Sequence, residues 1–186
     1  LVDVDGTRGQ IVITTLDDVK SRVTVLTSGP QGWQAREPDG LPRFGNVSVA
    51  PLEATEGDEL WVSTSDFLTP PQLMLMPPGG APDPVKSAPS FFDASKHEVQ
   101  QHFATSKDGT RVPYFLVIPQ GRTLDGTIPT LMNGYGGFEV SETPHYSAGI
   151  GKGWLEQGGA DVLTNIRGGG EYGPAWHQAA KGHQRQ

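Results

Sequence analysis

Short apolar runs separated by turn-forming residues dominate the first half of the chain. Each run is bounded by clusters of Gly, Pro or Asp. This spacing is typical of successive antiparallel strands in a β-sandwich or a β-propeller. The predicted strands are residues 10–15, 22–26, 46–50, 59–63 and 72–76.

A proline-rich stretch follows these strands. Residues 77–89 contain several prolines and two glycines but little apolar content, a composition that favours a crossing between two domains. We therefore place a domain boundary near residue 85, with residues 1–85 before it and residues 86–186 after it.

The second half begins with a predicted hairpin. Residues 99–106 and 112–118 flank Lys107-Asp108-Gly109-Thr110. The Asp-Gly pair accepts the positive backbone angles of a type I′ turn, so the two runs should pair as antiparallel strands.

The pattern then changes. Short apolar runs at 130–133 and 160–166 are separated by residues 146–158, which is long enough for a crossover helix and predicts a mostly parallel sheet. The chain starts at Leu1 and stops at Gln186, in what looks like the first turns of a helix. We therefore expect an internal fragment of a longer protein.

A glycine-dense loop follows the first of these two runs, with the sequence Asn133-Gly134-Tyr135-Gly136-Gly137-Phe138. Glycines allow backbone angles and close approaches that a Cβ would block. Such a loop after an early strand can supply a donor to an oxyanion hole, and Tyr135 could donate its hydroxyl. Alternatively, Tyr135 and Phe138 only cover an edge of the sheet.

A second glycine-dense loop follows the later run. Residues 168–173 contain the G-x-G-x-x-G pattern of dinucleotide-binding proteins, with a helix predicted from Pro174 onward. The acidic residue expected about 20 positions later would fall beyond the sequence. A structural turn between a strand and a helix therefore stands as the alternative.

Composition excludes several classes of function. The net charge of -7 and the absence of a basic stripe argue against nucleic acid, and the absence of Cys excludes a thiolate nucleophile. The five histidines lack the spacing of metal ligands, so no metal or cofactor is expected, and no apolar run is long enough to cross a membrane. The chain also has no G-x-S-x-G serine motif. The nucleophile of a hydrolase would therefore lie outside these residues.

Several blocks of the sequence resemble the prolyl oligopeptidase family, serine peptidases that carry a β-propeller over an α/β-hydrolase domain. The matching blocks are Ser65-Asp66-Phe67-Leu68-Thr69-Pro70, Ser106-Lys107-Asp108-Gly109-Thr110 with Val112-Pro113, Leu124-Asp125-Gly126, Asn133 to Phe138, Asn165 to Gly173, and Trp176-His177. Their order along the chain is the order in the family. Asn133 departs from the pattern, because the family often has an aromatic residue there.

The resemblance implies a fold and two site residues. The implied fold class is a partial α/β-hydrolase with a mostly parallel sheet, preceded by the last strands of a β-propeller within residues 1–85. Tyr135 matches the oxyanion-hole tyrosine of the family, and Phe138 matches an aromatic residue that lines the pocket for the proline side chain. The loop at residues 168–173 becomes a structural loop beside the active site instead of a dinucleotide site.

The resemblance also implies an activity for the parent protein. It would cleave short peptides after proline, and the family's Ser, Asp and His would all lie downstream of Gln186, so we expect this chain alone to be inactive. The alternatives are a basic-residue oligopeptidase, an esterase, or a nonenzymatic propeller protein that binds partners. Proline-containing peptides are the expected partners, the cytoplasm is the expected location with the periplasm as an alternative, and no oligomeric state is assigned.

Overall fold

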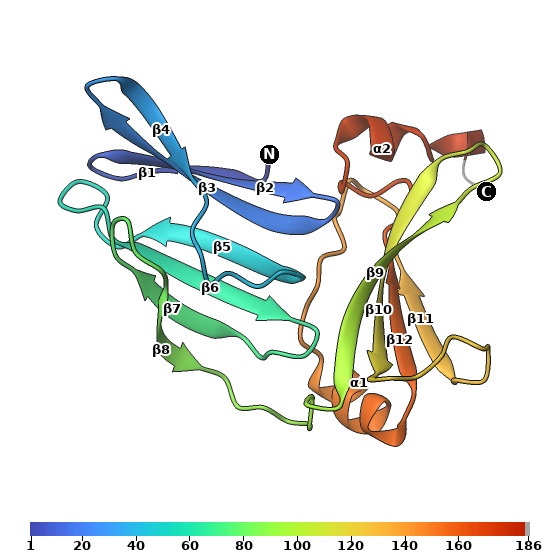
Figure 1. Cartoon of the computed structure of the whole chain (residues 1–186). Coiled ribbons are helices and arrows are strands. Elements are labelled where there is room, and N and C mark those ends of the chain that lie inside the picture. Colours follow the sequence, from blue (N-terminus) through green and yellow to red (C-terminus); the bar gives the residue numbers. More distant parts are fainter. Residues whose placement is uncertain (185–186) are drawn as a thin grey trace. The chain divides into compact units, whose positions relative to one another are not determined.

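The computed structural model describes residues 1–184 and contains three four-stranded β-sheets (Figure 1). The chain divides into two compact units. The first comprises residues 1–66 and 70–89, and the second comprises residues 67–69 and those from 90 onward. The expectation of a helix at Gln186 lies outside the described residues. The predicted boundary near residue 85 and the naming of residues 1–85 and 86–186 as two domains stay predictions.

The first unit consists of two antiparallel sheets in which each strand pairs only with its neighbours in sequence. Meanders of four strands are the blades from which β-propellers are built. The first sheet contains β1 (Asp3–Gly6), β2 (Gln10–Asp17), β3 (Lys20–Gly29) and β4 (Gly32–Arg36). The second contains β5 (Gly45–Pro51), β6 (Leu60–Asp66), β7 (Gln72–Met76) and β8 (Asp83–Ser87).

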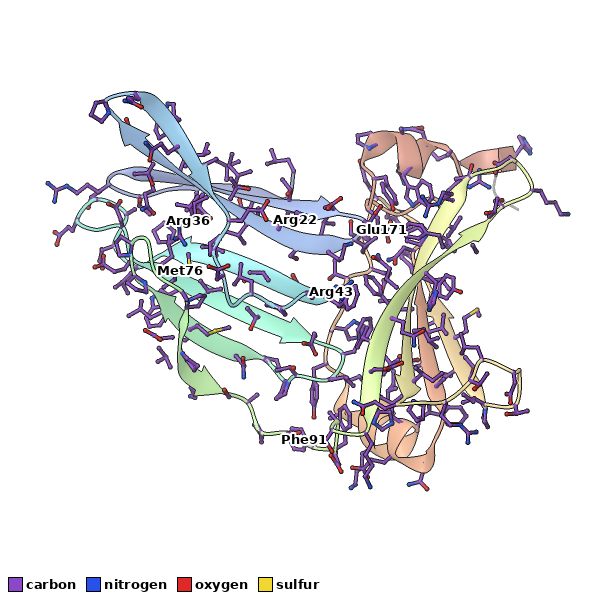
Figure 2. All side chains as sticks on the ribbon, viewed as in Figure 1. Arg22, Arg36, Arg43, Met76, Phe91 and Glu171 are labelled. Atoms are coloured by element: carbon purple, nitrogen blue, oxygen red, sulfur yellow. The ribbon has the colours of Figure 1, made fainter. Side chains whose placement is uncertain are left out.

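Alternating side chains from both sheets form the core of the first unit. In β2, β5 and β6 the first, third and fifth residues are buried, as expected for strands with one face toward a core. Met76 at the end of β7 is buried in this core (Figure 2). The core comprises Val12, Val23, Val25, Val47, Val49, Leu60, Val62, Met74 and Met76.

The second unit is built on one sheet with the strand order β11-β12-β10-β9. The predicted hairpin is confirmed, because β9 (His97–Thr105) and β10 (Arg111–Pro119) are antiparallel and Gly109 has a φ of 84° in the turn between them. The remaining strands are β11 (Thr130–Gly134) and β12 (Ala160–Thr164). The helical segments are α1 (Ala148–Gly153), η1 (Leu155–Gln157), α2 (Pro174–Gln178) and η2 (Gly182–Gln184).

The predicted fold class, a partial α/β-hydrolase with a mostly parallel sheet, is wrong. Only β11 and β12 are parallel, whereas β12 pairs with β10, and β10 with β9, in the antiparallel direction. The α-helices α1 and α2 have six and five residues. The structure is therefore mainly three antiparallel or mixed β-sheets. The predicted crossover between β11 and β12 contains α1 and η1.

All five strands predicted in the first half are present, but three further strands were missed. These are β1, β4 and β8, and β8 lies within the stretch that was predicted to be a linker. Among residues 1–184, none of the helices has the length and apolar content needed to span a bilayer.

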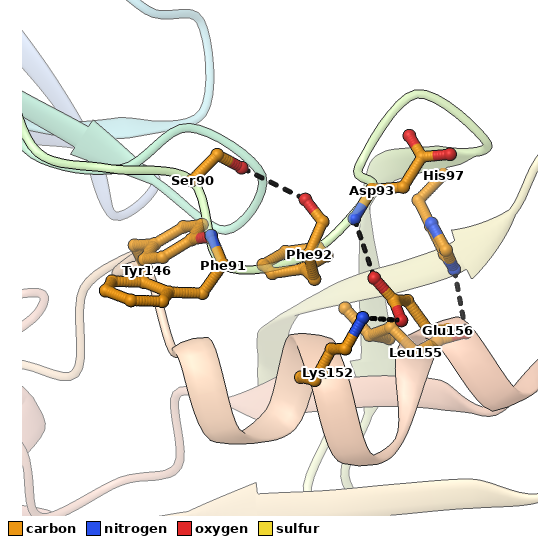
Figure 3. A network of polar contacts seen from close by, with 9 residues as sticks. All are labelled: Ser90, Phe91, Phe92, Asp93, His97, Tyr146, Lys152, Leu155 and Glu156. Atoms are coloured by element: carbon orange, nitrogen blue, oxygen red, sulfur yellow. Dashed lines mark hydrogen bonds and ion pairs between the residues drawn. The ribbon is translucent and has the colours of Figure 1, made fainter.

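A network of polar contacts attaches the segment before β9 to the helical region of the second unit (Figure 3). The N–H of Phe91 donates to the Tyr146 hydroxyl at 2.8 Å, and the N–H of Asp93 donates to Glu156 Oε1 at 2.8 Å. Phe92 stacks on Tyr146 with ring centroids 5.2 Å apart. These contacts fix the start of β9 against α1 and η1.

Candidate functional site

The two glycine-dense loops begin at the carboxyl ends of two neighbouring strands in the second unit's sheet. The first glycine loop, residues 134–142, follows β11, and the second glycine loop, residues 167–173, follows β12. Because β11 and β12 are parallel neighbours, their carboxyl ends lie side by side. Carboxyl ends of adjacent parallel strands are where α/β sheets commonly place ligands.

Backbone atoms of the two loops are in direct contact. A Cβ added to Gly136 would collide with the carbonyl oxygen of Arg167, and a Cβ added to Gly168 would collide with that of Gly136. Gly168 also has a φ of 106°, a backbone angle that residues with a Cβ rarely adopt. The close approach of the two backbones therefore requires glycine at Gly136 and Gly168.

Several backbone N–H groups of the second glycine loop already donate to carbonyl oxygens of this unit. The N–H of Gly170 donates to Val140 O at 3.1 Å, that of Gly168 to Trp176 O at 3.0 Å, and that of Gly173 to Gly170 O at 2.9 Å. A dinucleotide site needs free amides of this kind to bind a pyrophosphate. This arrangement fits the structural role of residues 168–173 that the family resemblance implies.

Tyr135 lies on the first glycine loop with 39% of its surface exposed. A Cβ added to Gly137 would lie 3.1 Å from the Tyr135 hydroxyl, so the ring folds back over this glycine. No residue within 1–184 makes a hydrogen bond to that hydroxyl. It can therefore donate to a ligand without breaking an existing bond.

Phe138 lies three residues further along the same loop and is 86% exposed. Its φ is 52° and that of Glu139 is 59°, a left-handed conformation that is uncommon for residues other than glycine. Strained backbone of this kind persists only where its surroundings hold it in place. The apolar ring of Phe138 is thus presented to solvent from a fixed stretch of chain.

His177 on α2 helps to hold this stretch. Its Nδ1 lies 2.7 Å from Gly168 O and 3.1 Å from the nitrogen of Glu139. Nδ1 cannot donate and accept at once. The shorter contact indicates that Nδ1 carries the proton and donates it to Gly168 O. The N–H of Glu139 then donates to the same carbonyl at 3.4 Å.

Arg167 connects the second glycine loop to the β9–β10 turn. Its guanidinium forms an ion pair with Asp108 and donates to Ser106 Oγ at 3.2 Å. The Thr110 N–H and the Arg167 guanidinium together hold the pKa of Asp108 well below its usual range. The family resemblance included the blocks that contain Asp108 and Arg167, but the ion pair between these two residues could not be inferred from the sequence.

The sequence analysis did not single out the two most buried polar side chains of this region. Asn165 and Glu171 flank the glycines of the second loop, and both are almost completely buried. No pattern in the sequence distinguishes them from surface residues. Within residues 1–184, no group of three or more His, Asp or Glu side chains is placed to hold a metal ion.

Known proteins with similar sequences and structures are peptidases, although no protein-family model matches the chain. An uncharacterized peptidase of Sinorhizobium fredii is 43% identical over 181 residues, which are 97% of this chain and 25% of the relative. The prolyl endopeptidase of Elizabethkingia meningoseptica is 37% identical over 147 residues, which are 78% of this chain and 21% of the relative.

A solved structure is similar as well. The post-proline cleaving enzyme from Rickettsia typhi superposes with a TM-score of 0.81 at 32% identity, over 98% of this chain and 26% of that one. This chain thus spans about a quarter of the length of the curated relatives it matches. With the glycine loops, the propeller-like sheets and these relatives in agreement, the chain belongs to the prolyl oligopeptidase family of peptidases.

Proposed function

We propose that the full-length protein carrying this segment is a serine peptidase that cleaves short peptides after proline. The observation that carries the proposal is the partly exposed Tyr135, whose hydroxyl makes no hydrogen bond within residues 1–184, on a loop held by backbone contacts. Similarity to prolyl endopeptidases supports the same substrate class.

Tyr135 would stabilise the transition state of acyl transfer. When a nucleophile attacks a peptide carbonyl, negative charge develops on the carbonyl oxygen. A fixed hydroxyl aimed at that oxygen binds the transition state more strongly than the substrate, which lowers the barrier. One such donor is typically worth about 3 kcal/mol.

Phe138 would bind the proline side chain. Its ring is apolar and almost fully exposed, so a flat, uncharged pyrrolidine can cover it without loss of hydrogen bonds. Apolar contacts of this kind discriminate by about 1 to 3 kcal/mol per methylene-sized difference.

The remaining catalytic groups would come from outside this sequence. A serine would attack the carbonyl, a histidine would take its proton and return it to the leaving amine, and an aspartate would orient the histidine. The chain contains no G-x-S-x-G motif to supply that serine. We therefore propose that residues 1–186 alone are inactive.

Replacement of Tyr135 by Phe in the full-length protein tests the proposal. The change removes the donor but keeps the ring, so kcat for a chromogenic Gly-Pro substrate should fall on the order of 100-fold while KM changes little. Steady-state kinetics with this substrate, and with an otherwise identical Arg-ending substrate, measures both activity and selectivity.

Tyr114→Phe is the matched control, because Tyr114 lies on β10 and its ring stacks on that of His102, outside both glycine loops, so its change should leave kcat unaltered. Equal kcat for the wild type and Tyr135→Phe would refute the oxyanion role. Preference for the Arg-ending substrate would point to a basic-residue oligopeptidase. Cleavage of neither peptide would leave the esterase or nonenzymatic alternative.

A further inference from the structure

Glu171 is a buried carboxyl that the proposed chemistry does not use. It is labelled in Figure 2 and directly follows the three glycines of the second loop. Only 4% of its surface is exposed. Its Oε1 accepts the N–H of Glu142 at 3.0 Å and Asn165 Nδ2 at 3.3 Å. Glu171 therefore reaches from the second glycine loop to the end of the first.

Asn165 completes the contact from the other side. Its side chain is fully buried, and its Nδ2 donates to the carbonyl of Glu142 at 2.6 Å. The backbone N–H and C=O of Glu142 are thus both held by side chains of the second loop region. We call this arrangement the Glu171–Asn165 clamp.

The clamp includes buried polar atoms that lack hydrogen-bond partners. Burial raises the pKa of Glu171, and neither Glu171 Oε2 nor Asn165 Oδ1 has a hydrogen-bond partner within residues 1–184. Buried polar atoms without partners cost free energy, and apolar residues of similar volume often cost less. What the polar pair provides, and an apolar pair could not, is a fixed position for the backbone of Glu142.

Holding residue 142 constrains the strained part of the first loop. Phe138 and Glu139 have positive φ angles, and the N–H of Gly170 donates to Val140 O just beyond them. At the other end of the loop, Thr164 Oγ1 donates to Asn133 O at 3.1 Å. The stretch carrying Tyr135 and Phe138 is therefore held on both sides, by β12 before it and by the clamp after it.

We propose that Glu171, together with Asn165, is a positioning residue for Tyr135. The clamp keeps the first glycine loop in the one conformation that aims the Tyr135 hydroxyl at the reacting carbonyl. Glu171 itself touches neither substrate nor nucleophile. This inference rests on the proposed function, because it assigns Glu171 a role through Tyr135.

A matched pair of substitutions in the full-length protein separates positioning from packing. Glu171→Gln keeps a side-chain oxygen that accepts the Glu142 N–H, whereas Glu171→Met keeps the length and volume but has no such acceptor. Because displacements of about 1 Å can cost on the order of 100-fold, Glu171→Met should lower kcat by at least about tenfold with little change in KM. Glu171→Gln should stay within about threefold of the wild type.

The decisive measurement is a double-mutant cycle with Tyr135→Phe. If Glu171 acts through the Tyr135 hydroxyl, Glu171→Met should lower kcat less than about twofold once that hydroxyl is gone. Independent, multiplicative losses in the double variant would overturn the inference, as would a Glu171→Gln variant as slow as Glu171→Met. Thermal unfolding of each variant shows that the protein compared is folded.

Failure of the proposed function can be distinguished from failure of the Glu171 inference. An unaltered kcat in Tyr135→Phe alone would refute the proposed function, whatever Glu171 does. If Glu171→Met does not fold, Asn165→Leu removes the donor to Glu142 O while keeping side-chain volume, and the same cycle with Tyr135→Phe applies. Non-additive losses there would support the clamp, and multiplicative losses would overturn it.

Discussion

Asp161 is a second buried carboxyl in the second unit. It lies on β12, only 7% of its surface is exposed, and its Oδ1 makes no hydrogen bond within residues 1–184. It borders a cavity of about 210 Å³ whose other polar lining includes Asn133, Glu142 and His145. Burial raises the pKa of Asp161, and the nearby His145 only partly opposes this.

Asp161 should make the stability of the protein depend on pH. A carboxyl whose pKa is raised by folding favours the folded state below its unfolded pKa of about 3.9, and this contribution is lost as the pH rises through the folded pKa. Asp161→Asn cannot ionise. The free energy of unfolding of this variant, measured in urea, should therefore fall less than that of the wild type between pH 4 and pH 7.

Asp93→Asn gives a control of opposite sign. Hydrogen bonds from the side chain and backbone of Ser95 lower the pKa of Asp93, so its contribution to stability is present above the unfolded pKa and lost as the pH falls. This variant should lose stability at pH 7. Identical pH profiles for the wild type and Asp161→Asn would show that Asp161 is not a source of the dependence.

Residue roles differed in how far the sequence could indicate them. Tyr135 and Phe138 are predicted site residues because glycine density and the family blocks mark their loop, and their roles stay predictions. Asn165 and Glu171 belong to the same blocks, but their burial follows from the packing of two loops about 30 residues apart in sequence. Sequence patterns carry no signal for such a tertiary contact.

Strands were predictable where one of their faces is buried. In β2, β5 and β6 buried residues alternate with less buried ones, and that alternation is visible in the sequence. The missed strands β1, β4 and β8 all lie at sheet edges and have hardly any buried residues. Hydrogen bonds to a neighbouring strand hold them, and these bonds leave no hydrophobic pattern.

Strand direction in the second unit was not predictable for a different reason. The apolar run that became β12 is buried along most of its length and fits either direction. β12 inserts between β10 and β11, so it is parallel to one neighbour and antiparallel to the other. The sequence indicated the parallel crossover but not the insertion beside β10.

Helix α1 offers a test of packing between elements. A Cβ added to Gly151 would collide with the ring of Phe92, which lies on the segment before β9 (Figure 3). Overpacking of this kind typically costs about 1 to 3 kcal/mol. Gly151→Ala should therefore lower the free energy of unfolding by that amount, as measured by urea denaturation.

Gly149→Ala is the control on the same helix. A Cβ at Gly149 would meet no atom within 4 Å, and alanine favours a helix over glycine by up to about 1 kcal/mol. This variant should be as stable as the wild type or more so. Equal destabilisation by both changes would mean that helix α1, and not its contact with Phe92, limits stability.

At the scale of the whole molecule, the second unit exposes apolar surface on its sheet. A groove of about 600 Å³ runs over its sheet and is lined by residues that include Leu116, Met132 and Val162. β11 forms an edge of that sheet, and Met132 on it is 67% exposed. Exposed apolar edge strands pair readily with other chains.

The isolated 186-residue chain should consequently self-associate. Met132→Lys places a charge on the exposed edge strand and should reduce association, as measured by light scattering over a range of concentrations. Val85→Lys is the control, because β8 is also an edge strand but already carries Asp83, Pro84 and Lys86. Equal effects of the two changes would show that added charge, and not the apolar edge, governs association.

The backbone contact between the two glycine loops also limits how this protein can be redesigned. Most interfaces inside a protein can be retuned, because a larger side chain on one side can be matched by a smaller one on the other. Gly136 and Gly168 meet without side chains. If a side chain is added to one of them, the other has no side chain that could be replaced by a smaller one. For the proposed peptidase, substrate preference should therefore be easier to alter at an exposed position such as Phe138 than at Gly136 or Gly168.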